Sequence, residues 1–220
     1  MEMLEYGDQS SKIVLIQMVD DHDLEMIENE FLLIREKTNQ GFLLRVFKVN
    51  SWNNDLSPWK SPAVFGKEDF GEGAGKTLKE ILPSCADNTK TYYIGGYSLA
   101  GLFALWSACQ TDVFRGVAAA SPSVWFPGFT EYMQKHEIKS KYVYLSLGDK
   151  EEKTRNPVMA KVAQRIREAY NNLQGQNIKS VLEWNEGNHF KEADLRTAKA
   201  FSWVMMQPGT MSELMGQEKA

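Results

Sequence analysis

The residue best placed to act as a nucleophile is a serine at the end of an apolar, tyrosine-rich segment. Ser98 lies in GGYSLAGLFALWSA, residues 95–108, where strand character gives way to helical character. A serine in such a tight turn has a strained backbone and projects its hydroxyl above the sheet, beside the free N–H groups that begin the helix. The turn needs small neighbours, and Gly96 and Ala100 supply them, although Ala100 replaces the second glycine of the usual Gly-x-Ser-x-Gly pattern. A nucleophilic Ser98 is therefore favoured over a serine that only caps the helix.

An acid follows the serine at the position that hydrolases with this turn require, because their catalytic groups run in the order serine, acid, histidine. The strand-like segment YVYLSLG, residues 142–148, is followed by DKEEK. We prefer Glu151, because a short turn after Gly148 can swing its side chain back toward the histidine loop. Asp149 and Glu152 are the alternatives.

The histidine that completes this order is His189, in NEGNHF, directly after a predicted strand. Of the two other histidines, His136 lies in a charged helix end, and His22 lies at the start of the first predicted helix. The order predicts that Ser98 attacks, that His189 takes and returns the proton, and that the acid orients the imidazole.

Strand-length apolar segments alternate with segments of helical periodicity, which is typical of a parallel sheet covered by helices. We predict an α/β domain over residues 1–206 and a loosely ordered tail over residues 207–220. Helices are predicted from about residue 23 to 37, from about 76, after 155 with Asn156 as its cap, and from about 192 to 206. The six predicted strands are residues 12–19, 42–49, 91–97, 116–120, 142–148 and 180–186.

A long connection, residues 50–75, is broken by glycine, proline and serine, and connections of this length are usually binding loops or lids. It carries several aromatic residues, and Trp125 follows the fourth predicted strand. We predict that Trp52 and Trp125 form walls of a pocket for an aromatic acyl or alcohol group. The alternative is that these aromatic side chains only fill the space under the loop.

The composition excludes several other functions. The 220 residues include 25 Lys and Arg and 29 Asp and Glu, so the net charge of −4 predicts no nucleic-acid partner. No apolar run reaches the length of a membrane helix, and the N-terminus lacks a secretory signal. Two cysteines, Cys85 and Cys109, are too few for a disulfide framework or a zinc cluster and fit a cytoplasmic protein. We expect no metal and no organic cofactor, and a small-molecule ester as the partner.

The motifs GGYSLAG, LGDKEE and NEGNHF resemble the branch of the α/β-hydrolase superfamily that includes enterochelin esterases, feruloyl esterases and esterase D. The resemblance implies a three-layer α/β-hydrolase sandwich that lacks the first two of the usual eight strands. Residues 42–49 would then form an edge strand. Its charged residues Arg45 and Lys48 discourage pairing between edges. The N-terminus or a second subunit, in a homodimer, are the alternatives for covering that edge.

The resemblance also implies roles for individual residues. The acid of this branch commonly stands three residues after the glycine that ends its strand, which supports Glu151. The backbone N–H of Leu99 would be one oxyanion donor, and an N–H from residues 19–21, for which we choose Asp20, would be the other. Larger relatives have a His-Gly-Gly-type sequence there, whereas this chain has VDDH.

The implied activity is hydrolysis of a carboxylic ester through an acyl-enzyme. The alternatives are a thioesterase, an acyltransferase or a peptidase that uses the same triad, and a binding protein with this fold but no activity.

Overall fold

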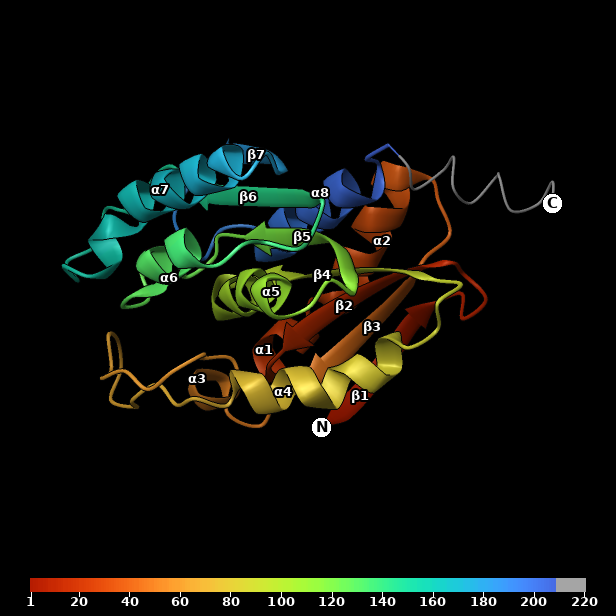
Figure 1. Cartoon of the computed structure of the whole chain (residues 1–220), viewed down its shortest axis with the longest axis horizontal. Helices are drawn as coiled ribbons and strands as arrows, with labels where there is room; N and C mark the ends of the chain where they lie inside the picture. The colour runs from red at the N-terminus through yellow and green to blue at the C-terminus, as the bar shows by residue number, and fades with distance from the viewer. Residues whose placement is uncertain (209–220) are drawn as a thin grey trace.

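The computed structural model describes residues 1–208, and its centre is a seven-stranded sheet with helices on both faces (Figure 1). The strand order is β1-β3-β2-β4-β5-β6-β7, and every pair is parallel except β1 with β3. The strands are β1 Glu2–Gly7, β2 Ile13–Val19, β3 Leu43–Lys48, β4 Thr91–Tyr97, β5 Phe114–Ala120, β6 Tyr142–Gly148 and β7 Lys179–Asn185.

The helices form two layers, one on each face of this sheet. Helices α2 and α8 pack on one face, and α4, α5, α6 and α7 cover the other (Figure 1). The helices are α1 Asp21–Leu24, α2 Ile27–Thr38, α3 Trp52–Asp55, α4 Ala74–Ile81, α5 Ser98–Gln110, α6 Phe129–Lys135, α7 Val162–Gly175 and α8 Ala193–Met205, with 3₁₀ turns η1 Leu82–Cys85 and η2 Met159–Lys161.

Alternate side chains of the central strands enter the two cores between these layers, which explains why the strands are continuous apolar runs. In β2, Val14 and Ile16 belong to the core under α5, whereas Leu15 and Val19 belong to the core under α8. Helix α5 is apolar on all sides, and every residue from Leu99 to Cys109 is buried. The predicted three-layer α/β architecture is confirmed.

The prediction of six strands with residues 42–49 at the edge is wrong, because the N-terminus adds a seventh strand. Strand β1 pairs antiparallel with β3, which therefore lies between β1 and β2. Its side chains alternate only weakly: Leu4 and Tyr6 are half-buried, and Glu5 accepts a 2.8 Å hydrogen bond from Arg45 Nε. A short, charged strand with one poorly buried face has almost no sequence signal. Of the two ways proposed for covering this edge, the N-terminus is the one that the structure has.

Two predicted segments have a finer structure than expected. The helix predicted over residues 23–37 is divided into α1 and α2, and the Asp20 carboxylate caps α1 by accepting from the N–H of Asp23. The connection over residues 50–75 contains α3 and an antiparallel bridge between Ser61 and Phe70. This connection therefore has defined secondary structure, and it lies beside the carboxyl ends of the strands.

Of the last two predicted helices, α8 has nearly the expected bounds, whereas α7 begins only at Val162. Asn156 Oδ1 accepts from the N–H groups of Val158 and Met159. The prediction that Asn156 caps the helix is wrong, because Val158 is the N-cap of η2 and Lys161 is the N-cap of α7. The predicted tail lies outside the described residues from residue 209 on. In residues 1–208, no helix is long and apolar enough to cross a membrane.

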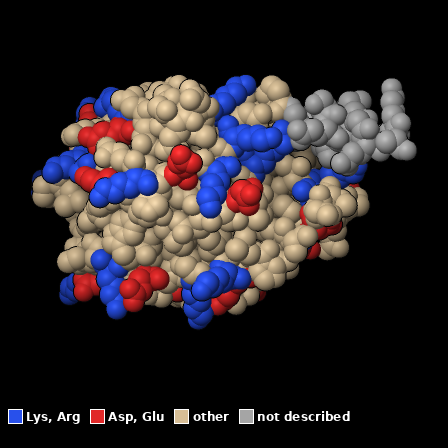
Figure 2. Space-filling model, viewed as in Figure 1, with Lys and Arg blue, Asp and Glu red and all other residues tan. Residues whose placement is uncertain are grey.

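Acidic and basic side chains are interspersed on the face of the molecule in Figure 2, with uncharged surface between them. That face therefore carries no broad area of a single sign.

Candidate active site

The turn from β4 into α5 holds Ser98 in a strained conformation, as the sequence predicted. Ser98 has a φ of +54°, in the left-handed region that side chains other than glycine rarely adopt. Gly96 has a φ of +154°, and a Cβ added there would lie 2.7 Å from the Cβ of Ala100. The turn therefore has room for a methyl group at position 96 or at position 100, but not at both. Alanine fits at position 100 only because residue 96 is glycine.

Three side chains from the carboxyl ends of three strands form a hydrogen-bonded row. Ser98 Oγ, after β4, lies 3.0 Å from His189 Nε2, in the loop after β7. His189 Nδ1 lies 2.7 Å from Glu151 Oε2, in the turn after β6. The structure therefore brings together the serine, the histidine and the preferred acid. Ser98 Oγ also lies 3.2 Å from Ser123 Oγ, which is a second partner for the hydroxyl.

Glu151 reaches this row because a tight turn folds it back over the end of β6. Its N–H donates to the carbonyl of Gly148, while the N–H of Gly148 donates to Glu151 Oε1 at 2.7 Å. Ser121 Oγ and Arg196 Nη1 also donate to Oε1, at 2.8 and 3.0 Å. The side chain is 4% exposed, so this carboxylate is held by four donors, including His189 Nδ1, away from water.

The two alternative acids occupy other places. Asp149 Oδ1 accepts a 2.7 Å hydrogen bond from the N–H of Gly187, so this carboxylate braces the loop that carries His189. Glu152 is exposed. The remaining histidines also differ: His22 lines the pocket described below, and His136 Nδ1 contacts the carbonyl of Tyr132 at the far end of α6.

The two predicted oxyanion donors lie at the starts of two helices. Leu99 follows Ser98 in the first turn of α5, where N–H groups have no partner within the helix. Asp20 follows β2, caps α1 and lines the same pocket as Ser98. Its carboxylate accepts from the N–H of Asp23, at 2.8 Å, which turns that charge toward the start of α1.

A pocket of about 550 Å³ opens beside Ser98 and His189. Trp52 and Trp125 both line it, as predicted, with Trp125 buried and Trp52 half-buried. The residues that line it come from the loops after β2, β3, β4, β5 and β7 and from η2: Asp20, His22, Asp23, Met26, Trp52, Phe65, Tyr97, Ser98, Trp125, Met159, His189, Phe190, Glu192, Ala193 and Asp194.

The pocket lining combines two kinds of residue. Aromatic residues and methionines make up part of it, and the acidic residues Asp20, Asp23, Glu192 and Asp194 also belong to it. Burial, reinforced by the negative charge of Asp20, raises the pKa of Asp23 to about 6. No lysine or arginine of residues 1–208 lines this pocket.

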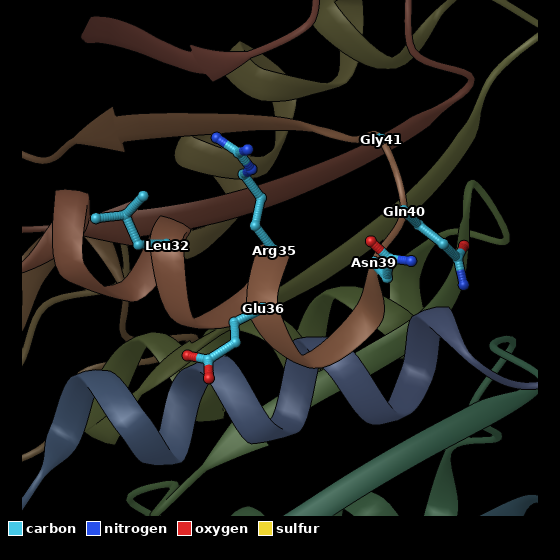
Figure 3. Close-up of a pocket in the computed structure, with 6 residues that line it drawn as sticks. All are labelled: Leu32, Arg35, Glu36, Asn39, Gln40 and Gly41. Atoms are coloured by element: carbon cyan, nitrogen blue, oxygen red, sulfur yellow. The ribbon is translucent and has the colours of Figure 1, made fainter.

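Another hollow, of about 590 Å³, lies at the end of α2, away from the serine. Leu32, Arg35, Glu36, Asn39, Gln40 and Gly41 line it. Figure 3 shows Arg35 and Glu36 pointing away from each other, so the polar groups do not converge on one point. No serine, cysteine or histidine lines this hollow, and we take the pocket at Ser98 as the candidate site.

Sequence reasoning missed Ser121 and Ser123, which contact Glu151 and Ser98, and three other residues near the row. Phe190 directly follows His189, is 89% exposed at the pocket mouth, and its adjacency to the histidine was an available signal. Tyr97 Oη donates to the carbonyl of His189 at 2.7 Å. Arg196, fully buried in α8, contacts Glu151, and nothing in a helical sequence distinguishes such an arginine from an exposed one.

No group of three or more His, Cys, Asp or Glu side chains in the described part of the chain is arranged to hold a metal ion. Cys85 and Cys109 are both buried with free thiols, and burial raises their pKa values to about 11 and about 12. Neither thiol therefore has the lowered pKa that is typical of a reactive cysteine.

Comparison with solved structures finds the same fold in several hydrolases. An IroE-like serine hydrolase from Shewanella oneidensis gives a TM-score of 0.74 at 15% identity, over 97% of this chain and 83% of that chain. The siderophore hydrolase EstA from Aspergillus nidulans gives 0.65 at 18% identity, over 90% of this chain and 84% of that chain. The enterobactin esterase FES from Shigella flexneri gives 0.63 at 12% identity, over 92% of this chain and 55% of that chain. No protein-family model and no curated protein sequence matches this chain.

Proposed function

We propose that this chain, which has the α/β-hydrolase fold, is a serine hydrolase that cleaves a small carboxylic ester through an acyl-enzyme. The observation that carries the proposal is the row of Ser98, His189 and Glu151, with separations of 3.0 and 2.7 Å. A strained serine whose hydroxyl meets an imidazole, which in turn meets a buried carboxylate, is the arrangement that activates a hydroxyl for attack on a carbonyl. The names of the structural neighbours, which include esterases, support the same chemistry.

In the proposed reaction, Ser98 Oγ attacks the ester carbonyl while His189 Nε2 takes the hydroxyl proton. The negative charge that forms on the carbonyl oxygen is stabilised by the N–H groups of Leu99 and Asp20. His189 then gives its proton to the departing alcohol, and the acyl group stays on Ser98. Water, activated by His189, attacks this acyl group and releases the acid. Glu151 orients the imidazole and stabilises its protonated form in both steps.

The pocket supports an ester with an aromatic or other apolar group as the substrate. Trp52, Phe65, Trp125 and Phe190 all line it, and the rings of Phe65 and Trp125 contact each other. Neighbouring structures are named as a siderophore hydrolase, an enterobactin esterase and a ferulic acid esterase, so a siderophore and an ester of ferulic acid are the first substrates to test. Thioesters, amides and acyl transfer to an alcohol belong in the same panel, because the triad alone does not select the leaving group.

The first experiment measures hydrolysis of a p-nitrophenyl ester and labelling by a fluorophosphonate. We expect the unmodified protein to do both, and Ser98→Ala to lose labelling and at least about 10³-fold in turnover. Ser107→Ala is the matched control, because Ser107 is a buried serine of the same helix whose hydroxyl has no hydrogen-bond partner. If Ser98→Ala hydrolyses the ester as fast as its parent, the proposal is wrong. If the unmodified protein is neither labelled nor active, the alternative of a binding protein gains support.

A further inference from the structure

Arg196 is a positive charge buried directly behind the proposed triad. It lies in α8, and its side chain is 1% exposed. A buried guanidinium is costly unless its N–H groups meet acceptors of matching geometry. Its contacts therefore indicate what holds it there.

The guanidinium contacts Glu151 directly, and it reaches the loop of His189 through Tyr97 and a backbone carbonyl. Nη1 donates to Glu151 Oε1 at 3.0 Å and to Tyr97 Oη at 3.1 Å. Nη2 donates to the carbonyl of Glu186, at 3.1 Å, in the loop that carries His189. A longer contact of 3.3 Å joins Nη1 to Ser121 Oγ, which itself donates to Glu151 Oε1.

Two of the hydrogen bonds lead in sequence from Arg196 through Tyr97 to the backbone of His189. Tyr97 Oη accepts from Arg196 and donates to the carbonyl of His189 at 2.7 Å. The tyrosine ring also lies against the imidazole, with ring centroids 5.1 Å apart. One guanidinium thus fixes the carboxylate on one side and, through Tyr97 and the Glu186 carbonyl, the backbone of the histidine loop on the other.

We propose that Arg196 is a positioning residue that sets the distance and angle between Glu151 and His189 in the proposed hydrolase. This inference rests on the proposed function. Arginine suits the role because its planar fork reaches two acceptors in fixed directions, which the single ammonium of lysine does not. Arg196 touches neither Ser98 nor the pocket, so it acts on the reaction only through the two residues it holds.

The test compares Arg196→Lys with the unmodified protein on the best p-nitrophenyl ester. Arg196→Lys keeps the charge and loses the fork. We expect kcat to fall about 10- to 100-fold, because small displacements of catalytic groups have effects of this size, while KM changes by less than about 3-fold. The rate of fluorophosphonate labelling should fall in parallel. Arg167→Lys is the control, since Arg167 lies over Trp184 at the surface.

Tyr97→Phe keeps the ring and removes only the hydroxyl that joins Arg196 to the His189 carbonyl. It should lower kcat about 3- to 10-fold at constant KM, and the double variant should lose less than the product of the two single losses. A purely structural Arg196 would lower the melting temperature and leave kcat of the folded variant unchanged, which would overturn the inference. If Arg196→Lys does not fold, a parental kcat for Tyr97→Phe overturns it. An unmodified protein without activity would instead contradict the proposed function itself.

Discussion

Gly148 ends β6 directly beneath Glu151, and the space around its α-carbon is filled. A Cβ at this position would lie 2.3 Å from the carbonyl oxygen of Gly187 and 3.0 Å from both Glu151 Oε1 and Arg196 Nη1. Glycine here thus lets the acid turn and the histidine loop approach each other. Gly148, the residue before DKEE, therefore ends the strand and also meets a packing requirement.

We therefore predict that Gly148→Ala lowers kcat about 10- to 100-fold, because the added methyl group must push Glu151 or the loop of His189 out of place. Gly175→Ala is the control, since a Cβ there meets nothing within 4 Å. Steady-state kinetics and circular dichroism of both variants check this. Equal activity of Gly148→Ala and Gly175→Ala would show that the acid turn tolerates the displacement.

At the scale of single residues, the sequence predicts those catalytic residues whose positions depend on the order of the strands and on the residues of a turn. Ser98 and His189 follow from the small residues around a strand end and from the order of the catalytic groups. Glu151 follows only with the help of a resemblance, because Asp149 and Glu152 have the same chemistry. Arg196 could not be predicted, because its burial depends on contacts with Tyr97 and Glu151, 99 and 45 residues away in the sequence.

Helix α1 and the loop that precedes it place carboxylates against the pocket, which has a measurable effect on stability. The pKa of Asp23 is raised to about 6, by burial first and by Asp20 second, from an ordinary value of 3.8. Between about pH 4 and pH 6 the folded state holds a proton that the unfolded state has lost, so stability falls as pH rises through this window. Above it, the ionised carboxylate destabilises the fold by a constant amount.

Asp23→Asn removes this ionisation and should raise the free energy of unfolding by roughly 1–3 kcal/mol at pH 8, with the difference vanishing near pH 4. Urea unfolding of the variant and its parent at the two pH values measures the effect. Asp112→Asn, at an exposed carboxylate, serves as the control and should show no such pH-dependent gain. A gain for Asp23→Asn that is as large at pH 4 as at pH 8 would contradict an ionisation effect.

Among the elements, every predicted strand is present to within about two residues, and of the strands in residues 1–208 only β1 was missed. Strands β2 and β4 are buried almost throughout because both cores contact them. Strand β1 was missed because only Leu4 and Tyr6 of its side chains turn partly inward, and its pairing with β3 is a tertiary contact. The break between α1 and α2, at residues 25–26, was missed because Leu24, Ile27, Phe31 and Ile34 keep a helical spacing across it.

For the whole molecule, the sheet order brings the loops after β2, β3, β4, β5 and β7 to one end, where they form a pocket with a marked charge. Four carboxylates line it without a lysine or arginine of the described residues. Sequence composition could not reveal this, because a net charge of −4 over 220 residues says nothing about where the charges lie. Carboxylates gathered around one pocket act on a charged ligand more strongly than the same charges spread over the surface do.

We therefore predict that an ester whose acyl chain ends in a carboxylate is a poor substrate. Its kcat/KM should be at least about 10-fold below that of a neutral ester of equal length, because like charges in the pocket repel it. A chain ending in a trimethylammonium group should equal or exceed the neutral ester. The measurement compares the three p-nitrophenyl esters at low and at high salt. Asp194→Asn should narrow the gap between the anionic and the neutral ester without changing the rate for the neutral one. Equal rates for all three esters at low salt would mean that the end of the acyl chain does not come close to the carboxylates that line the pocket.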